Sequence, residues 1–322
     1  MRSQDASCVA LPTTQPVHPA RNTGQLMRAD NLEQAFAPIY NYALVTDARE
    51  GLILVDVNTL ADGDFRNNRL RRALTWNPGG RLDGAHHVTI GGSYAYVVAD
   101  AGLVVLDLRQ PLEPVIVASL PLNHGRASAL QFRYLFVTDA DGLKVIDVTH
   151  PDRARLLPEA SLKLNSAQGI FLARTYAYVA NGPQGLAIVD IERPEHPKLL
   201  QQYDAGGEIT DAHDVVVAST NASLFAYVAD GTGGLKVLQL TAPDTQPKFY
   251  GFSPEPRPQL IARYTTRYPA LSLSRPLERD RAVDETGGQV AVFGRRGARP
   301  FNGVEMRRMY LDANGEPWHV QD

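Results

Sequence analysis

The chain has 322 residues, of which 44% are hydrophobic and 21% are charged, enough apolar material for a sizeable core. Its 32 Lys and Arg against 35 Asp and Glu give a formal net charge of −3, which argues against nucleic-acid binding and against a general attraction to anionic membranes. The single cysteine, Cys8, excludes an intrachain disulfide. Because no run of about 18 apolar residues is present, we expect no membrane-spanning segment.

The N-terminal residues 1–30 are expected to form a partly disordered leader. No apolar stretch follows Arg2, so the chain as written carries no secretory signal, and a cytoplasmic protein and a start further upstream both remain open. Cys8 has no histidine neighbour here, which makes it a poor candidate for a nucleophile. Residues 25–27 can add a strand that closes the predicted ring.

The rest of the chain is dominated by an internal repeat, in which a glycine leads an apolar run that usually ends in aspartate. The five copies are residues 51–56 (GLILVD), 102–107 (GLVVLD), 142–147 (GLKVID), 185–190 (GLAIVD) and 234–239 (GLKVLQ). A second apolar strand precedes each copy, as in residues 94–97 (YAYV), and a short Asp/Asn/Gly turn separates the two. Glycine permits φ > 0 and aspartate bonds its own backbone, so each pair is predicted to be a β-hairpin.

Two further strands flank each hairpin. An inner strand precedes it, as in residues 170–172 (IFL), and an outer strand follows it, as in residues 197–200 (PKLL). Four antiparallel strands within about 40–45 residues are the size of one β-propeller blade. The strand after each glycine lacks strict alternation of apolar and polar residues, which indicates a sheet buried on both faces. The predicted fold is therefore an all-β propeller of four-stranded antiparallel blades.

These strand, turn, strand and aspartate patterns resemble LVIVD repeats, over roughly residues 40–265. The resemblance implies a bacterial β-propeller protein, secreted, periplasmic or on the cell surface, with no established common activity. We assign residues 31–267 to five such blades and residues 268–322 to a divergent C-terminal blade that closes the ring. Six blades are expected, and five or seven remain compatible. Gln239 replaces the aspartate in the fifth copy, and the first copy lacks a clear inner strand.

Polar residues at the start of the inner strands are the candidate site, because inner strands line the central channel of a propeller. Aligned on the following strands, one residue per blade is expected at one level of the channel, with three more nearby. These residues are His86, Ser128, Gln168 and His213, with His87, Asp211 and Asp214 beside them. Imidazole and carboxylate groups could bind a divalent metal there, but equally they can cap strand ends and bond to backbone or water. These residues alone assign no metal ligand and no cofactor.

The aspartates that end the repeated strand are expected to have a structural role. They are Asp56, Asp107, Asp147 and Asp190. One copy per blade suits a side chain that bonds loop backbone, whereas catalysis rarely needs four equivalent copies. No nucleophile elbow, P-loop or dinucleotide fingerprint is present, so no catalytic residue is assigned.

The sequence favours a non-catalytic binding or scaffold module over an enzyme. Rigid blades that present uneven loops suit an unknown protein or surface ligand held at one rim. The alternative is a metal-dependent hydrolase or lyase with a channel site near His86 and His213.

Overall fold

The computed structural model describes most of the repeat region and parts of both ends. The described residues are 2–12, 37–60, 62, 64–220, 223–244, 246, 253–274, 295–296, 299–300, 304 and 311–316. Within them, the strands form five four-stranded antiparallel sheets and one two-stranded hairpin. The fold is therefore the predicted all-β propeller of four-stranded blades, and five blades are described.

Each sheet uses four strands that are consecutive along the chain, ordered from the innermost to the outermost. The first sheet contains β1 (Ala6–Ala10), β2 (Tyr42–Asp47), β3 (Gly51–Asp56) and β4 (Arg71–Trp76). The second contains β5 (His87–Gly91), β6 (Tyr94–Ala99), β7 (Gly102–Asp107) and β8 (Val115–Leu120), and the third β9 (Ala127–Gln131), β10 (Tyr134–Asp139), β11 (Gly142–Asp147) and β12 (Arg155–Lys163). The fourth contains β13 (Ile170–Ala173), β14 (Tyr176–Ala180), β15 (Leu186–Asp190) and β16 (Lys198–Tyr203), and the fifth β17 (Asp214–Thr220), β18 (Ser223–Ala229), β19 (Leu235–Gln239) and β20 (Gln259–Tyr264).

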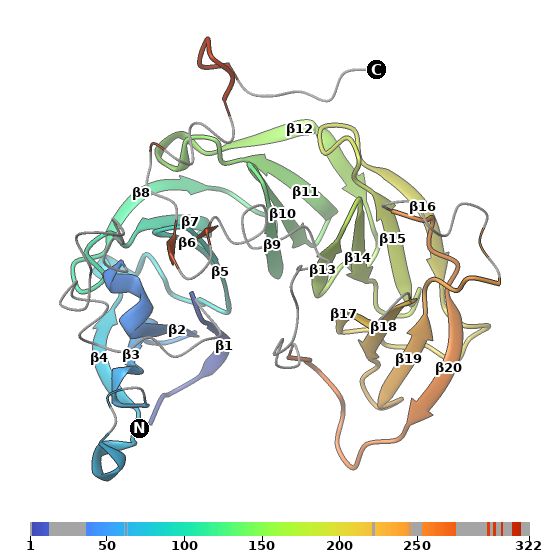
Figure 1. Ribbon diagram of the computed structural model, residues 1–322, viewed down its shortest axis with the longest axis horizontal. Helices are drawn as coiled ribbons and strands as arrows, with labels where there is room; N and C mark the ends of the chain where they lie inside the picture. Colours follow the sequence, from blue (N-terminus) through green and yellow to red (C-terminus); the bar gives the residue numbers. More distant parts are fainter. Residues whose placement is uncertain are drawn as a thin grey trace, which may run out of the picture.

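The five sheets follow one another around an arc, with first strands inside and fourth strands outside (Figure 1). Short 3-10 turns punctuate the connections: η1 (Pro38–Asn41), η2 (Asn58–Leu60), η3 (Phe65–Asn67), η4 (Pro78–Gly80) and η5 (Pro151–Arg153). A small hairpin pairs β21 (Arg295–Arg296) with β22 (Arg299–Pro300). In the described part of the chain, no helix is long and apolar enough to cross a membrane.

The glycine that opens each repeated strand is required by close packing of the outermost strand. Gly142 has φ +137°, and a Cβ atom at that position would lie 2.2 Å from the carbonyl oxygen of Leu162. Gly102 has φ +105° and the same relation to Leu120. Because a side chain can occupy neither the conformation nor the space, the repeat keeps glycine at the hairpin turn.

The core consists of apolar layers between adjacent sheets, as expected for strands that are buried on both faces. All six residues of β7 and all six of β10 are buried. Large aromatic and small side chains share these layers: Phe136 and Ala177 belong to one buried cluster, and Tyr178 and Ala226 to another. Burying a side chain of this size contributes roughly 2–3 kcal/mol, so each layer holds two blades together.

The inner strand of the first sheet comes from the N-terminal end of the chain. In β1, Val9 pairs with Val45, and Cys8 with Thr46. The expectation that Cys8 lies in a disordered leader is therefore wrong. The sequence of β1, ASCVA, is too short and too weakly apolar to be recognised alone, and its pairing with β2 spans about thirty residues of chain. Residues 25–27 lie outside the described residues.

The segment that follows the fifth sheet bonds to that sheet in the same way as the segment before the fifth sheet bonds to the fourth. Ala212 exchanges two backbone hydrogen bonds with Gly182 of the fourth sheet, both 3.0 Å. Ala270 exchanges the same pair with Gly231 of the fifth sheet, at 3.0 and 2.8 Å. The segment at Ala270 thus stands where a sixth inner strand would begin. Most of the predicted sixth blade, 268–322, lies outside the described residues, so six blades stay a prediction.

Candidate functional site

The inner strands begin at one level of the channel, and backbone hydrogen bonds fix which residues share that level. Their N–H groups donate to equivalent carbonyl oxygens on the second strand of each sheet. The donors are His86 to Val98, Arg126 to Thr138, Gln168 to Ala180 and His213 to Ala229, at 2.7–3.0 Å. Four sheets therefore place two histidines, an arginine and a glutamine at the channel mouth.

Ser128 is not a member of this level, which corrects the sequence alignment. It pairs with Val137 as Val88 pairs with Val97, two residues further along the inner strand than His86. The sequence Ala127-Ser128-Ala129-Leu130 imitates the Ala-x-x-apolar start of the other inner strands, so alignment on residue type chose the wrong register. Arg126 was missed for the same reason.

Side chains at the channel mouth bond across the seams between neighbouring sheets. Ser7 Oγ donates to the carbonyl oxygen of His86 at 3.0 Å, and an Arg126 guanidinium nitrogen donates to that of Ala167 at 2.7 Å. At the next seam the Gly169 N–H donates to the carbonyl oxygen of His213 at 2.9 Å. Each such bond links one sheet to the next, so this ring of residues holds the blades in place.

His86 lies at the seam between the second and third sheets, and each of its ring nitrogens contacts a backbone carbonyl oxygen. Nδ1 lies 2.7 Å from the carbonyl oxygen of Gly84, and Nε2 lies 2.7 Å from that of Gly125. A carbonyl oxygen only accepts, so at least one ring nitrogen of His86 donates, and both nitrogens face backbone oxygens. The ring is held between two carbonyl oxygens and directs neither nitrogen toward another candidate ligand.

His87 lies one step further into the channel and belongs to a chain of hydrogen bonds. Thr89 Oγ1 donates to the carbonyl oxygen of Ser128 at 3.0 Å and lies 2.8 Å from Ser128 Oγ, which in turn lies 3.3 Å from His87 Nδ1. The Thr89 proton can be directed to only one of these two oxygens, so the direction of the Ser128 hydroxyl and the tautomer of His87 are coupled. Burial, together with the charge of His86, lowers the pKa of His87 to about 4.

Cys8 in the first sheet and Asp214 in the fifth are equivalent in position to His87 in the second. They pair with Thr46 and Ala229 as His87 pairs with Val98. Burial raises the pKa of the Cys8 thiol, and the nearby Asp214 carboxylate raises it further. Burial also raises the pKa of Asp214, although its carboxylate accepts N–H hydrogen bonds from Leu273 and Val215, both at 2.8 Å. Both groups are thus biased toward their neutral forms.

The remaining candidate residues form local contacts of their own. His213 Nε2 lies 3.0 Å from Asp211 Oδ2, and both side chains are partly exposed to solvent. Gln168 reaches the hydroxyl of Ser166 at 3.5 Å. His86 and His213 share no bonding partner, because His86 bonds to the third sheet and His213 pairs within its own. Within the described ranges, no three His, Cys, Asp or Glu side chains are arranged to hold a metal ion.

Comparison with known proteins agrees with the repeat geometry. A family model described as the LVIVD repeat matches residues 84–120, 165–205 and 211–243. The chain contains LVIVD repeats. These matches cover the second and fourth sheets and the first three strands of the fifth.

Among solved structures, the β-propeller domain of Cps50 (Swd1) from Myceliophteria thermophila aligns at 9% identity with a TM-score of 0.49, over 83% of this chain and 74% of that one. AztD from Citrobacter koseri aligns at 16% identity with a TM-score of 0.39, over 72% of this chain and 58% of that one. A search of curated proteins found no match.

The aspartates that end the LVIVD strands brace the turn that follows. Each accepts a hydrogen bond from the backbone N–H two residues later, at 2.9–3.0 Å, in the pairs Asp56 with Asn58, Asp107 with Arg109, Asp147 with Thr149 and Asp190 with Glu192. This is an Asx-turn, in which the carboxylate replaces a backbone acceptor. The geometry gives these residues a structural role.

One of these aspartates also anchors a buried ion pair between two LVIVD repeats. The Arg133 guanidinium is almost fully buried and donates to Asp147 at 3.0 Å and to Glu195 of the fourth sheet at 2.9 Å. Tyr134 donates to the same Glu195 oxygen at 2.6 Å, and Arg133 lies 4.4 Å from the Tyr134 ring centroid. All charges are paired, so this cluster is a link between repeats rather than a reactive centre.

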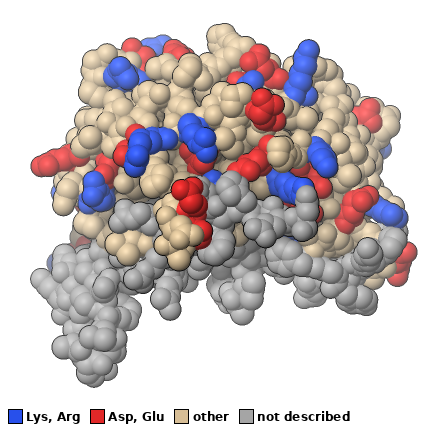
Figure 2. Space-filling view, turned by 90° about the horizontal axis from the view of Figure 1, so that it is seen from above, with Lys and Arg blue, Asp and Glu red and all other residues tan. Residues whose placement is uncertain are grey.

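The outer surface carries charges of both signs. On the face drawn in Figure 2, the Lys and Arg side chains of the described residues are interspersed with Asp and Glu. Such mixing produces no strong field of one sign over that face.

Proposed function

We propose that this LVIVD-repeat chain is a non-catalytic binding module that holds a protein or surface ligand at the rim of the propeller, in a secreted or cell-surface bacterial context. The observation that carries the proposal is His86: both of its ring nitrogens face backbone carbonyls. The channel-mouth residues serve the seams between blades. The metal-dependent hydrolase near His86 and His213 gains no support from this geometry.

The loops on the channel-mouth rim differ between blades, and that difference supports ligand binding. The connection into the inner strand of the third sheet spans residues 121–126, and the fourth sheet has one of equal length, 164–169. The fifth sheet has the longer connection 204–213. There Ala205 has φ +57°, and Gly206 and Gly207 project where an added Cβ atom would meet nothing within 4 Å. A projecting loop on a rigid frame is a common ligand-binding arrangement.

Deletion of residues 205–208 tests the binding role, because it leaves a connection as long as 121–126. A peptide library displayed on phage is selected on the immobilised wild-type chain, and the enriched peptides are then bound to the deletion variant. We expect peptides that bind the wild type and lose at least tenfold in affinity on the variant, with melting temperature unchanged. Absence of enrichment over an unrelated immobilised protein would contradict the proposal.

His86→Ala and Arg126→Ala test the structural role of the channel mouth. Each substitution removes a seam bond and should lower the free energy of unfolding by about 1–3 kcal/mol. Added EDTA or Zn²⁺ should change neither the wild type nor the variants. A metal-dependent stabilisation that is lost only in His86→Ala would instead favour the metal enzyme.

A further inference from the structure

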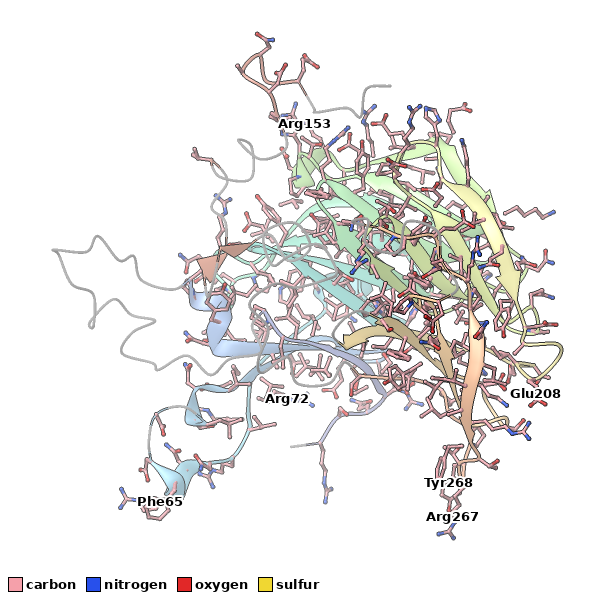
Figure 3. All side chains as sticks on the ribbon, turned by 45° about the vertical axis from the view of Figure 1, so that its right-hand side comes forward. Phe65, Arg72, Arg153, Glu208, Arg267 and Tyr268 are labelled. Atoms are coloured by element: carbon pink, nitrogen blue, oxygen red, sulfur yellow. The ribbon has the colours of Figure 1, made fainter. Side chains whose placement is uncertain are left out.

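Two exposed aromatic side chains project from opposite ends of the arc. Phe65, in the connection between β3 and β4, is 82% exposed, and Tyr268, just after β20, is 70% exposed. Figure 3 shows both at the lower edge of the molecule, on the side away from Arg153. In that view the tip of the first blade and the tip of the fifth blade lie at the same edge of the molecule.

The first tip is an insertion with its own bracing. The connection between the third and fourth strands spans residues 57–70 here, whereas the second, third and fourth sheets use shorter ones, such as 108–114. Within it, Asn67 Nδ2 donates to Asp62 at 2.7 Å, and the Arg66 N–H donates to Asp64 at 3.0 Å. The tip is thus held in shape before any partner arrives, which reduces the entropy lost on binding.

The same connection also contains exposed leucines and arginines. Leu60 is 53% exposed and Leu70 is 48% exposed. Arg66 pairs with Asp64, but Arg69, also exposed, has no ion-pair partner among the described residues. The first tip therefore combines an apolar surface with a positive charge that is available to a ligand.

The second tip repeats this chemistry. The Arg267 guanidinium lies 5.3 Å from the Tyr268 ring centroid, and Thr266 Oγ1 donates to the Tyr268 carbonyl oxygen at 2.6 Å. Tyr264, on the adjoining strand, is 68% exposed. Residues 259–274 contain no Asp or Glu, so the charge of Arg267 is not offset within its own segment.

We propose that the two tips dock the protein on the surface of an anionic phospholipid bilayer. Tyr and Phe side chains are favoured at the boundary between headgroups and acyl chains, and arginine binds the lipid phosphates. Two convex tips at the same edge of the molecule match a flat surface, whereas a protein partner would need a separate pocket for each. The net charge of −3 gives no overall attraction, so binding depends on these local groups and is weakened by salt.

Co-sedimentation with vesicles tests the proposal on the full chain. The probes are vesicles of phosphatidylcholine alone and of phosphatidylcholine with about 30% phosphatidylglycerol, at low and high salt. We expect binding to the anionic vesicles only, reduced at high salt. Arg267→Glu should weaken binding at least fivefold, since one basic residue near an anionic surface contributes about a fivefold change. Phe65→Ser should weaken it several-fold as well.

Matched variants distinguish the tips from general surface effects. Arg153→Glu makes the same charge change at the opposite end of the molecule, and Leu112→Ser removes a half-exposed apolar side chain from a short loop of the second sheet. Both should bind vesicles like the wild type. Equal losses in Arg153→Glu and Arg267→Glu, or no binding to anionic vesicles at low salt, would overturn the lipid assignment. Peptide binding at the channel-mouth rim is measured separately, so that result leaves the proposed function standing.

Discussion

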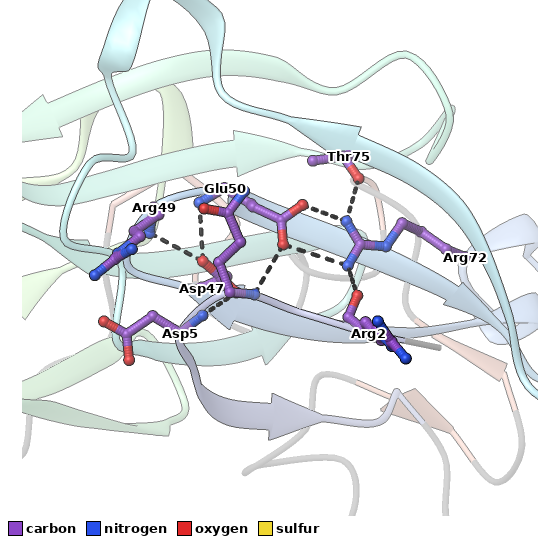
Figure 4. Close-up of polar contacts among 8 residues, drawn as sticks. Arg2, Asp5, Asp47, Arg49, Glu50, Arg72 and Thr75 are labelled. Atoms are coloured by element: carbon purple, nitrogen blue, oxygen red, sulfur yellow. Dashed lines mark hydrogen bonds and ion pairs between the residues drawn. The ribbon is translucent and has the colours of Figure 1, made fainter.

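Asp47 attaches the N-terminal strand to the first blade, and its substitution gives the sharpest test of the fold. Its carboxylate is fully buried and accepts four backbone N–H groups (Figure 4). Two come from Gln4 and Asp5, at 3.0 and 2.8 Å, and two from Arg49 and Glu50, both at 2.9 Å. One side chain thus joins the segment that leads into β1 to the turn between β2 and β3.

Asp47→Asn keeps the shape of the side chain but removes the charge and half of the acceptors. One amide oxygen can still serve two donors, while the NH2 group faces the other two N–H groups and cannot accept from them. Hydrogen bonds to a charged group contribute about 1.5–3 kcal/mol each, so losing two should lower the free energy of unfolding by about 3–6 kcal/mol. Asp190→Asn is the control, because among the described residues that carboxylate accepts one hydrogen bond, from the Glu192 N–H. Its cost should stay below about 1.5 kcal/mol.

Acid dependence provides a second readout of the same attachment. Burial raises the pKa of Asp47, but the four N–H groups outweigh burial and hold it below its ordinary value. The stabilisation is therefore complete above the unfolded pKa of about 3.9 and is lost as pH falls through the folded pKa. Asp47→Asn should remove this part of the acid dependence.

Urea unfolding followed by Trp fluorescence measures these effects, since Trp76 lies on β4 of the same sheet. Hydrogen exchange of the Ala48 N–H, which donates to the Asp5 carbonyl oxygen at 3.0 Å, reports whether the segment that leads into β1 detaches before the sheet unfolds. If Asp47→Asn and Asp190→Asn cost the same, the attachment argument is refuted.

Two further predictions concern the channel and the hairpin turns. Because the pKa of folded His87 lies near 4, below the unfolded value of about 6.5, the unfolded chain binds more protons in that window. Stability should fall by roughly 2.5 kcal/mol from pH 6.5 to pH 4, and His87→Gln should flatten this slope in urea titrations. Gly142→Ala should cost about 2–4 kcal/mol, since it combines positive φ with a clash against Leu162, whereas Gly207→Ala, with positive φ in open space, should cost about 1 kcal/mol in the same assay. Equal costs for the two glycines would show that the clash is unimportant.

The parts of the fold that were predictable are those fixed by neighbours in the sequence. The hairpin from β6 to β7 needs only its apolar strands and the glycine of its turn, and both lie within a short stretch of chain. The strand β1 was not predictable, because its identity depends on a pairing with β2 across the long connection that separates them. The N–H groups that bond Asp47 belong to the backbone of Gln4 and Asp5, and any residue could supply them. The residue types before β1 therefore did not indicate this attachment.

The contacts of the candidate site residues were not predictable from the sequence. The histidines do begin inner strands, yet the role of His86 depends on Gly125, a residue of the next repeat that offers only its carbonyl oxygen. An alignment of repeats compares equivalent positions, so it cannot reveal contacts between positions that are not equivalent. Arg126 performs the same task with a different side chain, so no common residue type marks this position.

The same reasoning explains why the inner strands diverge while the LVIVD strands do not. Each LVIVD strand meets the same surroundings, a turn glycine, an outer strand and two apolar layers, so one sequence serves every blade. In the channel each position instead adapts to its neighbour. A Cβ atom on Gly169 would lie 2.2 Å from Asp214 Oδ1, so the glycine of the fourth sheet makes room for the carboxylate of the fifth. Asp214 in turn accepts the N–H of Leu273, three residues after Ala270. The residue types of the inner strands thus vary because each one is matched to a contact in the neighbouring blade. For Asp214 one such contact is with the segment that follows the fifth blade.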